Sequence, residues 1–154
     1  MFSAAKTAAP VSGAYTLTKS LRFRSSATAY LNRTFGAGNQ QKWTFSTWFK
    51  IGTIGTNKVL LSCGSGATDS LFYINSSDQL VFNLDNVTCR QTTMIFRDPS
   101  AWYHLVVALD TTNATAQNRV RIYINGVEIT SWVYNTTITQ NRSEERRVGK
   151  ECRL

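Results

Sequence analysis

The stretch that decides the fold is RVRIYINGVEIT, from Arg119 to Thr130. Alternating apolar residues flank its central Asn125-Gly126 on both sides. Asn-Gly between two such runs predicts a two-residue type I′ turn, because that turn requires a positive φ at both central positions. The stretch therefore predicts a β-hairpin of fixed register.

Further strand signals recur along the chain upstream of this hairpin. The strongest is KWTFSTWFKI (Lys42–Ile51), which places Trp43 and Phe45 on one face and Trp48 on the other. AWYHLVVALD (Ala101–Asp110) is apolar on both faces, as expected of a central strand in a sandwich. The other predicted strands are SLRF (Ser20–Phe23), AYLNRT (Ala29–Thr34), KVLLSCG (Lys58–Gly64), the hairpin SLFYINSSDQLVFNL (Ser70–Leu84) and TTMIF (Thr92–Phe96).

The composition agrees with an all-β domain. No segment keeps an apolar period of 3.6 residues between capping residues. A chain of 154 residues, 42% hydrophobic and 12% aromatic, is long enough for one packed core. We therefore predict an all-β, antiparallel β-sandwich or jelly roll. Residues 1–19, which contain Pro10 and Gly13, are expected to form a flexible N-terminal arm.

The net charge of +8 does not gather in a nucleic-acid-binding stripe. Residues 142–154 carry five basic and three acidic side chains, which leaves twelve basic and six acidic ones scattered over residues 1–141. No apolar stretch is long enough for a signal-peptide core or a membrane span. We expect a soluble protein that binds neither nucleic acid nor membrane.

Three blocks of the sequence resemble a known family. WTFSTWFK (Trp43–Lys50), WYHLVVALDTT (Trp102–Thr112) and VRIYINGVEI (Val120–Ile129) stand in the order and spacing of laminin-G-like domains of the concanavalin A-like lectin/glucanase superfamily. This resemblance implies a concanavalin A-like jelly roll. The opening strands and FRDPSAWYH (Phe96–His104) resemble the versions carried by bacteriophage tail and structural proteins.

The end of the chain departs from this family. Family members continue for several strands after the hairpin, whereas SWVYNTTITQN (Ser131–Asn141) begins such a continuation and then gives way to a charged segment. RSEERRVGKEC (Arg142–Cys152) resembles the in-frame translation of a widely used sequencing-library adapter. We therefore expect a domain over residues 20–141 that is truncated before its final strands, followed by a non-native tail over residues 142–154.

The sequence contains few residues in patterns that catalysis would require. Glycoside hydrolysis needs a pair of carboxylates that flank the scissile bond. The acidic residues before the tail are Asp69, Asp78, Asp85, Asp98, Asp110 and Glu128, and no two occupy alternate positions on one predicted strand. The single histidine, His104, has no orienting carboxylate that the sequence can place, so a structural role is expected. We predict that the protein is not an enzyme.

Candidate binding residues are those that a sugar or a cation would recognise. Exposed aromatic rings beside amide groups suit a sugar, and the candidates are Trp132, Tyr134 and Asn135, with Tyr30 and Asn32 as a second group. The resemblance also implies a possible Ca²⁺ site at strand ends, for which Asp69, Asp85 and Asp110 are the candidates. Local turn bonding by these aspartates is the competing interpretation.

Two interpretations of the cysteines stay open: Cys63 and Cys89 are either buried thiols or partners that face each other on neighbouring strands. For the whole chain, the leading hypothesis is a non-catalytic carbohydrate-binding module of a phage tail or surface-appendage protein, carried in the virion after synthesis in the bacterial host cytoplasm. The alternative is a structural virion domain that packs against other subunits, and a glycoside hydrolase comes third.

Overall fold

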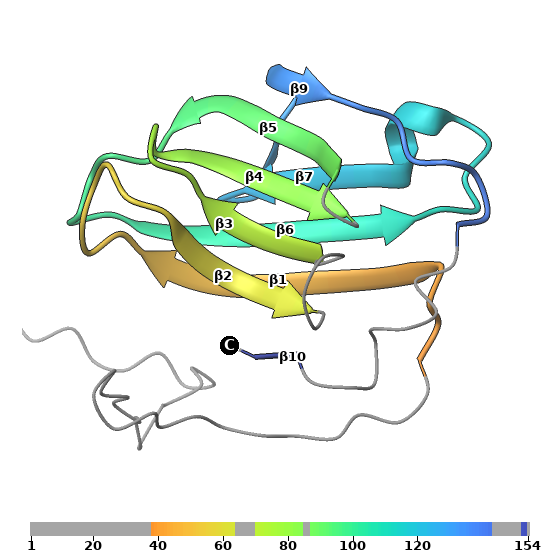
Figure 1. The fold of residues 1–154 in the computed structure, drawn as a ribbon, viewed down its shortest axis with the longest axis horizontal. Coiled ribbons are helices and arrows are strands. Elements are labelled where there is room, and N and C mark those ends of the chain that lie inside the picture. The colour runs from red at the N-terminus through yellow and green to blue at the C-terminus, as the bar shows by residue number, and fades with distance from the viewer. Residues whose placement is uncertain (1–37, 64–69, 85–86, 143–151, 154) are drawn as a thin grey trace, which may run out of the picture. The chain divides into compact units, whose positions relative to one another are not determined.

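The computed structural model describes residues 38–63, 70–84, 87–142 and 152–153. The predicted N-terminal arm, the predicted strands over residues 20–23 and 29–34, and most of the predicted tail lie outside these residues. The described part is an all-β structure built from two antiparallel sheets, as predicted. Figure 1 shows the two sheets as separate layers.

The first sheet has four strands in the order β1-β6-β7-β8. They are β1 (Lys42–Lys50), β6 (Trp102–Asp110), β7 (Val120–Ile124) and β8 (Val127–Glu128), and a 3-10 helix, η2 (Ala116–Arg119), precedes β7. Asn125 and Gly126 join β7 to β8 with φ values of 51° and 80°. The type I′ hairpin predicted from Asn-Gly is therefore confirmed.

The second sheet has six strands in the order β10-β2-β3-β4-β5-β9. They are β10 (Cys152–Arg153), β2 (Lys58–Cys63), β3 (Ser70–Ile74), β4 (Gln79–Leu84), β5 (Val87–Ile95) and β9 (Trp132–Asn135). The predicted hairpin over residues 70–84 is confirmed as β3 and β4. β5 begins earlier than predicted, because VTCRQ pairs with β4 although its polar residues gave no strand signal.

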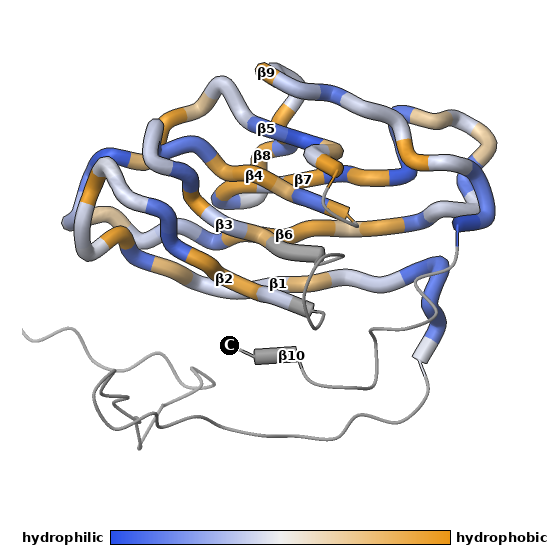
Figure 2. Tube along the Cα trace, viewed as in Figure 1, coloured by the Kyte–Doolittle hydropathy of each residue, from blue (hydrophilic) through white to orange (hydrophobic). Residues whose placement is uncertain are grey.

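The core lies between the two sheets, where their inward side chains interlock. Phe72 stacks on Phe82 with ring centroids 4.5 Å apart, and on Phe45 of the opposite sheet at 5.6 Å. Trp43 meets both Phe72 and Phe82 edge-on. Apolar segments accordingly run along the central strands in Figure 2, while the turns are mostly polar. Aromatic contacts between the sheets thus account for the bulky composition.

Two buried arginines hold the C-terminal part of the domain in place. Arg90 is 1% exposed and donates to the carbonyls of Cys89 and Thr136, at 3.0 and 2.6 Å. Arg119 is 8% exposed and donates to the carbonyl of Ile138 at 2.6 Å. Neither guanidinium has a carboxylate partner within the described residues. Both arginines thus hydrogen-bond to the backbone that follows β9 and hold it against the domain.

The arrangement of the sheets rules out one of the two interpretations of the cysteines. Cys63 lies on β2 and Cys89 on β5, with β3 and β4 between them. Because neighbouring strands are about 4.8 Å apart, the two backbones are separated by roughly 14 Å. That spacing exceeds the reach of a disulfide. The interpretation in which they face each other on neighbouring strands is therefore wrong.

Candidate functional site

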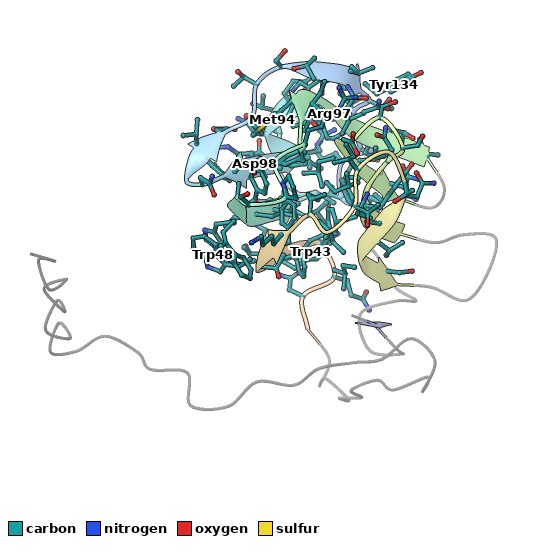
Figure 3. All side chains as sticks on the ribbon, turned by 90° about the vertical axis from the view of Figure 1, so that its left-hand side faces the viewer. Trp43, Trp48, Met94, Arg97, Asp98 and Tyr134 are labelled. Carbon is teal, nitrogen blue, oxygen red and sulfur yellow. The ribbon has the colours of Figure 1, made fainter. Side chains whose placement is uncertain are left out.

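The outward side of the four-stranded sheet gathers exposed aromatic rings. In the pairing of β1 with β6, Trp48 stands opposite His104, and Lys50 stands opposite Trp102. Trp48 is 62% exposed and Trp102 is 60% exposed. Figure 3 shows Trp48 at the outside of the packed side chains, whereas Trp43 of the same strand lies nearer the interior. We call the outward side of β1, β6, β7 and β8 the tryptophan face.

His104 contacts the Trp48 ring and two polar groups on this face. The imidazole of His104 stacks on the Trp48 ring with centroids 4.7 Å apart and an interplanar angle of 17°. The Ser46 Oγ lies 2.9 Å from His104 Nε2. The backbone N–H of His104 donates to the Asn125 Oδ1 at 2.8 Å. The histidine is thus half-exposed, and it stacks on the Trp48 ring instead of lying in the core.

Charged groups border the aromatic rings on the tryptophan face. Arg121 binds Glu128 with its Nε at 2.8 Å from Oε1, and its guanidinium lies 5.5 Å from the Tyr123 ring centroid. The hydrogen bond from Arg121 lowers the pKa of Glu128. At the other end, Lys42 lies 3.3 Å from Asp110. Both carboxylates on this face are therefore held by cations.

The two sides of β6 differ in burial, which exposes part of this site. Its sequence is apolar on both faces. Of its first six residues, however, only Tyr103, Leu105 and Val107 are buried. Trp102 and His104 project from the opposite side, which the described residues leave open to solvent. The outward side of β6 is therefore exposed at Trp102 and half-buried from His104 to Asp110.

The sugar site predicted from sequence is divided by the structure. Trp132 and Tyr134 lie on β9, an ordered strand paired with β5, and not on a loop. A bulge places Trp132 opposite the inward Thr92, and Tyr134 opposite the outward Gln91. Trp132 packs against the core with the Arg90 guanidinium 5.5 Å from its ring, while Tyr134 is 56% exposed. Asn135 is exposed, but Trp132 and Tyr134 do not share a face.

The second predicted sugar group, Tyr30 and Asn32, lies outside the described residues, as do the calcium candidates Asp69 and Asp85. Asp110 is described, and it accepts hydrogen bonds from the Thr112 hydroxyl at 2.6 Å and the Thr112 N–H at 3.0 Å. The Thr112 hydroxyl is the main cause of the lowered pKa of Asp110. No three His, Cys, Asp or Glu side chains form a metal-binding group within the described ranges.

The outward side of the six-stranded sheet has a different character. Val59, Tyr73, Val81, Gln91 and Tyr134 stand opposite one another in a single row across β2, β3, β4, β5 and β9. Gln91 donates to the Gln79 Oε1 at 2.8 Å across this surface. The outward side chains that the structure describes on these strands carry no charge. We call this side the uncharged face.

The sequence alone predicted one of the two tryptophans of the tryptophan face. Trp48 was assigned to the side of its strand opposite Trp43 and Phe45, and a lone outward tryptophan beside polar residues is itself a surface signal. Trp102 gave no such signal, since its strand is apolar on both sides. Register decides that the two rings are neighbours, and register depends on strand pairing.

The comparison with protein families agrees with this architecture. The laminin-G-type model of the concanavalin A-like lectin/glucanases superfamily matches residues 23–152. The chain belongs to this superfamily, whose members include both glycosidases and non-catalytic lectins. No curated protein matches the sequence. In the part of the chain that is described, no helix has the length and apolar character needed to cross a bilayer.

Proposed function

We propose that the protein is a non-catalytic carbohydrate-binding module that binds sugars on the tryptophan face. The observation that carries this proposal is the placement of Trp48 and Trp102, each more than half exposed, on one side of two paired strands. The C–H bonds on the face of a pyranose ring are attracted to the negative face of an aromatic ring. Ser46 and His104 offer hydrogen-bonding groups to sugar hydroxyls beside the rings.

The non-catalytic part of the proposal rests on the state of the carboxylates. Asp110 and Glu128 project from the tryptophan face, and each is held by a cation, Lys42 or Arg121. A glycosidase needs one carboxyl group with a raised pKa as the general acid. Hydrogen bonds and cations here lower the pKa of both groups. That is the opposite of what an acid catalyst requires.

The biological setting that we propose is the tail or another surface appendage of a bacteriophage, with the ligand on the bacterial cell surface. Support comes from the resemblance of FRDPSAWYH (Phe96–His104) to the versions of this domain carried by phage structural proteins. The module would then act in the virion and hold the particle at a surface glycan.

The test compares tryptophan variants with a matched tyrosine variant on the other sheet. Trp48→Ala and Trp102→Ala are each expected to weaken sugar-inhibitable binding to bacterial cells about ten-fold, as expected for loss of an aromatic anchor. Tyr134→Ala removes a ring of similar exposure from the uncharged face and is expected to leave binding unchanged. Loss of binding in Tyr134→Ala, with both tryptophan variants intact, would contradict the proposal.

A second candidate function, subunit packing in a virion, draws support from the uncharged face. A chain of net charge +8 repels its own copies, and a surface free of charge is where another subunit can approach at the least electrostatic cost. We expect Ile95→Lys, which places a charge on this face, to weaken self-association measured by sedimentation velocity. Thr44→Lys adds the same charge to the tryptophan face and serves as the control. Equal sedimentation of both variants and the unaltered chain would remove this candidate.

A further inference from the structure

One cation on the tryptophan face is left without an acidic partner. Within the described residues, Lys42 is paired with Asp110 and Arg121 with Glu128, whereas Lys50 forms no ion pair. The two carboxylates of this face are thus already neutralised. Lys50 therefore supplies an uncompensated positive charge at the end of the sheet where the tryptophans lie.

The position of Lys50 brings this charge close to both rings. Lys50 stands directly opposite Trp102, and Trp48 precedes it by two positions on the same side of β1. Directly opposed residues on one face of an antiparallel pair have Cβ atoms about 5 Å apart. The ammonium is carried on a flexible four-carbon stem, so it can reach a ligand that is seated on either ring.

We infer that the tryptophan face selects acidic saccharides that carry a carboxylate, such as uronic acids, over neutral ones. This inference rests on the proposed function and names the class of ligand for the same site. In a hexuronic acid, the equatorial carboxylate extends from the edge of the pyranose ring, roughly in its plane. The ring can therefore stack on Trp48 or Trp102 while its carboxylate binds the Lys50 ammonium, and the net charge of +8 attracts the same ligand at longer range.

The experiment measures binding of two matched probes, a trimer of galacturonic acid and the corresponding trimer of galactose, by isothermal titration calorimetry at low ionic strength. The unaltered chain is expected to bind the acidic trimer about five-fold more tightly. Lys50→Gln is expected to abolish this difference and to leave binding of the neutral trimer unchanged. The matched control is Lys58→Gln, which removes the same charge from β2 of the other sheet.

The outcomes separate the selectivity from the proposed function. Equal binding of the two trimers by the unaltered chain would overturn the inference, and so would equal losses in Lys50→Gln and Lys58→Gln, which would indicate long-range attraction by net charge alone. Failure to bind the acidic trimer would also overturn it. The proposed function is tested separately by the effect of the tryptophan variants on cell binding, so it can stand or fail independently.

Discussion

The outward sides of the two sheets differ in the number of charged side chains that they carry. The tryptophan face carries Lys50 and two ion pairs, Lys42–Asp110 and Arg121–Glu128, around its exposed rings. The uncharged face carries amides, hydroxyls and apolar groups, and its sheet instead holds an arginine, Arg90, on the buried side. One sheet thus presents charged side chains to solvent, while the other uses a buried charge to hold the fold together. Arginine thus forms an exposed ion pair at Arg121 and a buried contact with backbone carbonyls at Arg90.

The sharpest test of this comparison replaces one arginine on each sheet. Arg90→Met is expected to lower the free energy of unfolding by about 3 kcal/mol, because buried carbonyls that it now satisfies would lose their donor. Arg121→Met breaks an exposed ion pair and is expected to cost about 1 kcal/mol or less. Urea denaturation of both variants measures the difference. Similar losses would mean that the two guanidiniums have the same role.

A smaller effect is expected at the hairpin that carries Glu128 onto the tryptophan face. Gly126 has a φ of 80°, where a Cβ is strained although no atom lies within 4 Å of it. Gly126→Ala is expected to cost about 1 kcal/mol of unfolding free energy. Gly52→Ala, at a glycine with equal space and no such φ, is the control and should be neutral or slightly stabilising. Equal shifts of the two urea midpoints would show that turn strain has no part in the hairpin.

The smallest and most pH-dependent effects involve a carboxylate from each sheet. The Gly55 N–H, at 2.7 Å, and the guanidinium of Arg97, at 2.9 Å, lower the pKa of Asp78, in the turn before β4, and Arg121 lowers that of Glu128. A carboxylate with a folded pKa below its unfolded one stabilises the fold above the unfolded value. This contribution is lost as the pH falls through the folded value.

We therefore expect stability to fall as the pH drops below about 5, and less steeply in Asp78→Asn and Glu128→Gln. The slope should change more for Asp78→Asn, since the Asp78 side chain is 2% exposed and that of Glu128 is 34% exposed. Thermal unfolding across this pH range gives the slopes. A larger change in the slope for Glu128→Gln would contradict the expectation that Asp78 contributes more to stability than Glu128.

Local pattern alone was enough to predict much of the fold. The Asn125-Gly126 turn, the hairpin over residues 70–84 and the two-sided character of Lys42–Ile51 all follow from interactions between residues close in sequence. The polar start of β5 was missed, because Arg90 is buried by contacts with β4 and β9 that the sequence does not reveal. The division of the β9 residues was missed for the same reason, since a bulge places Trp132 and Tyr134 on opposite sides of the sheet.

By itself, the sequence determined the all-β class, the positions of most described strands and the resemblance to the concanavalin A-like family. Side-chain alternation along a strand is a property of the local backbone, so it can be predicted from the order of residues alone. Tertiary structure decided which strands are neighbours, and hence that Lys50 lies beside Trp102 and that Cys63 lies far from Cys89. The physical reason is that pairing and register are set by contacts between residues distant in sequence, whose energies depend on the whole fold.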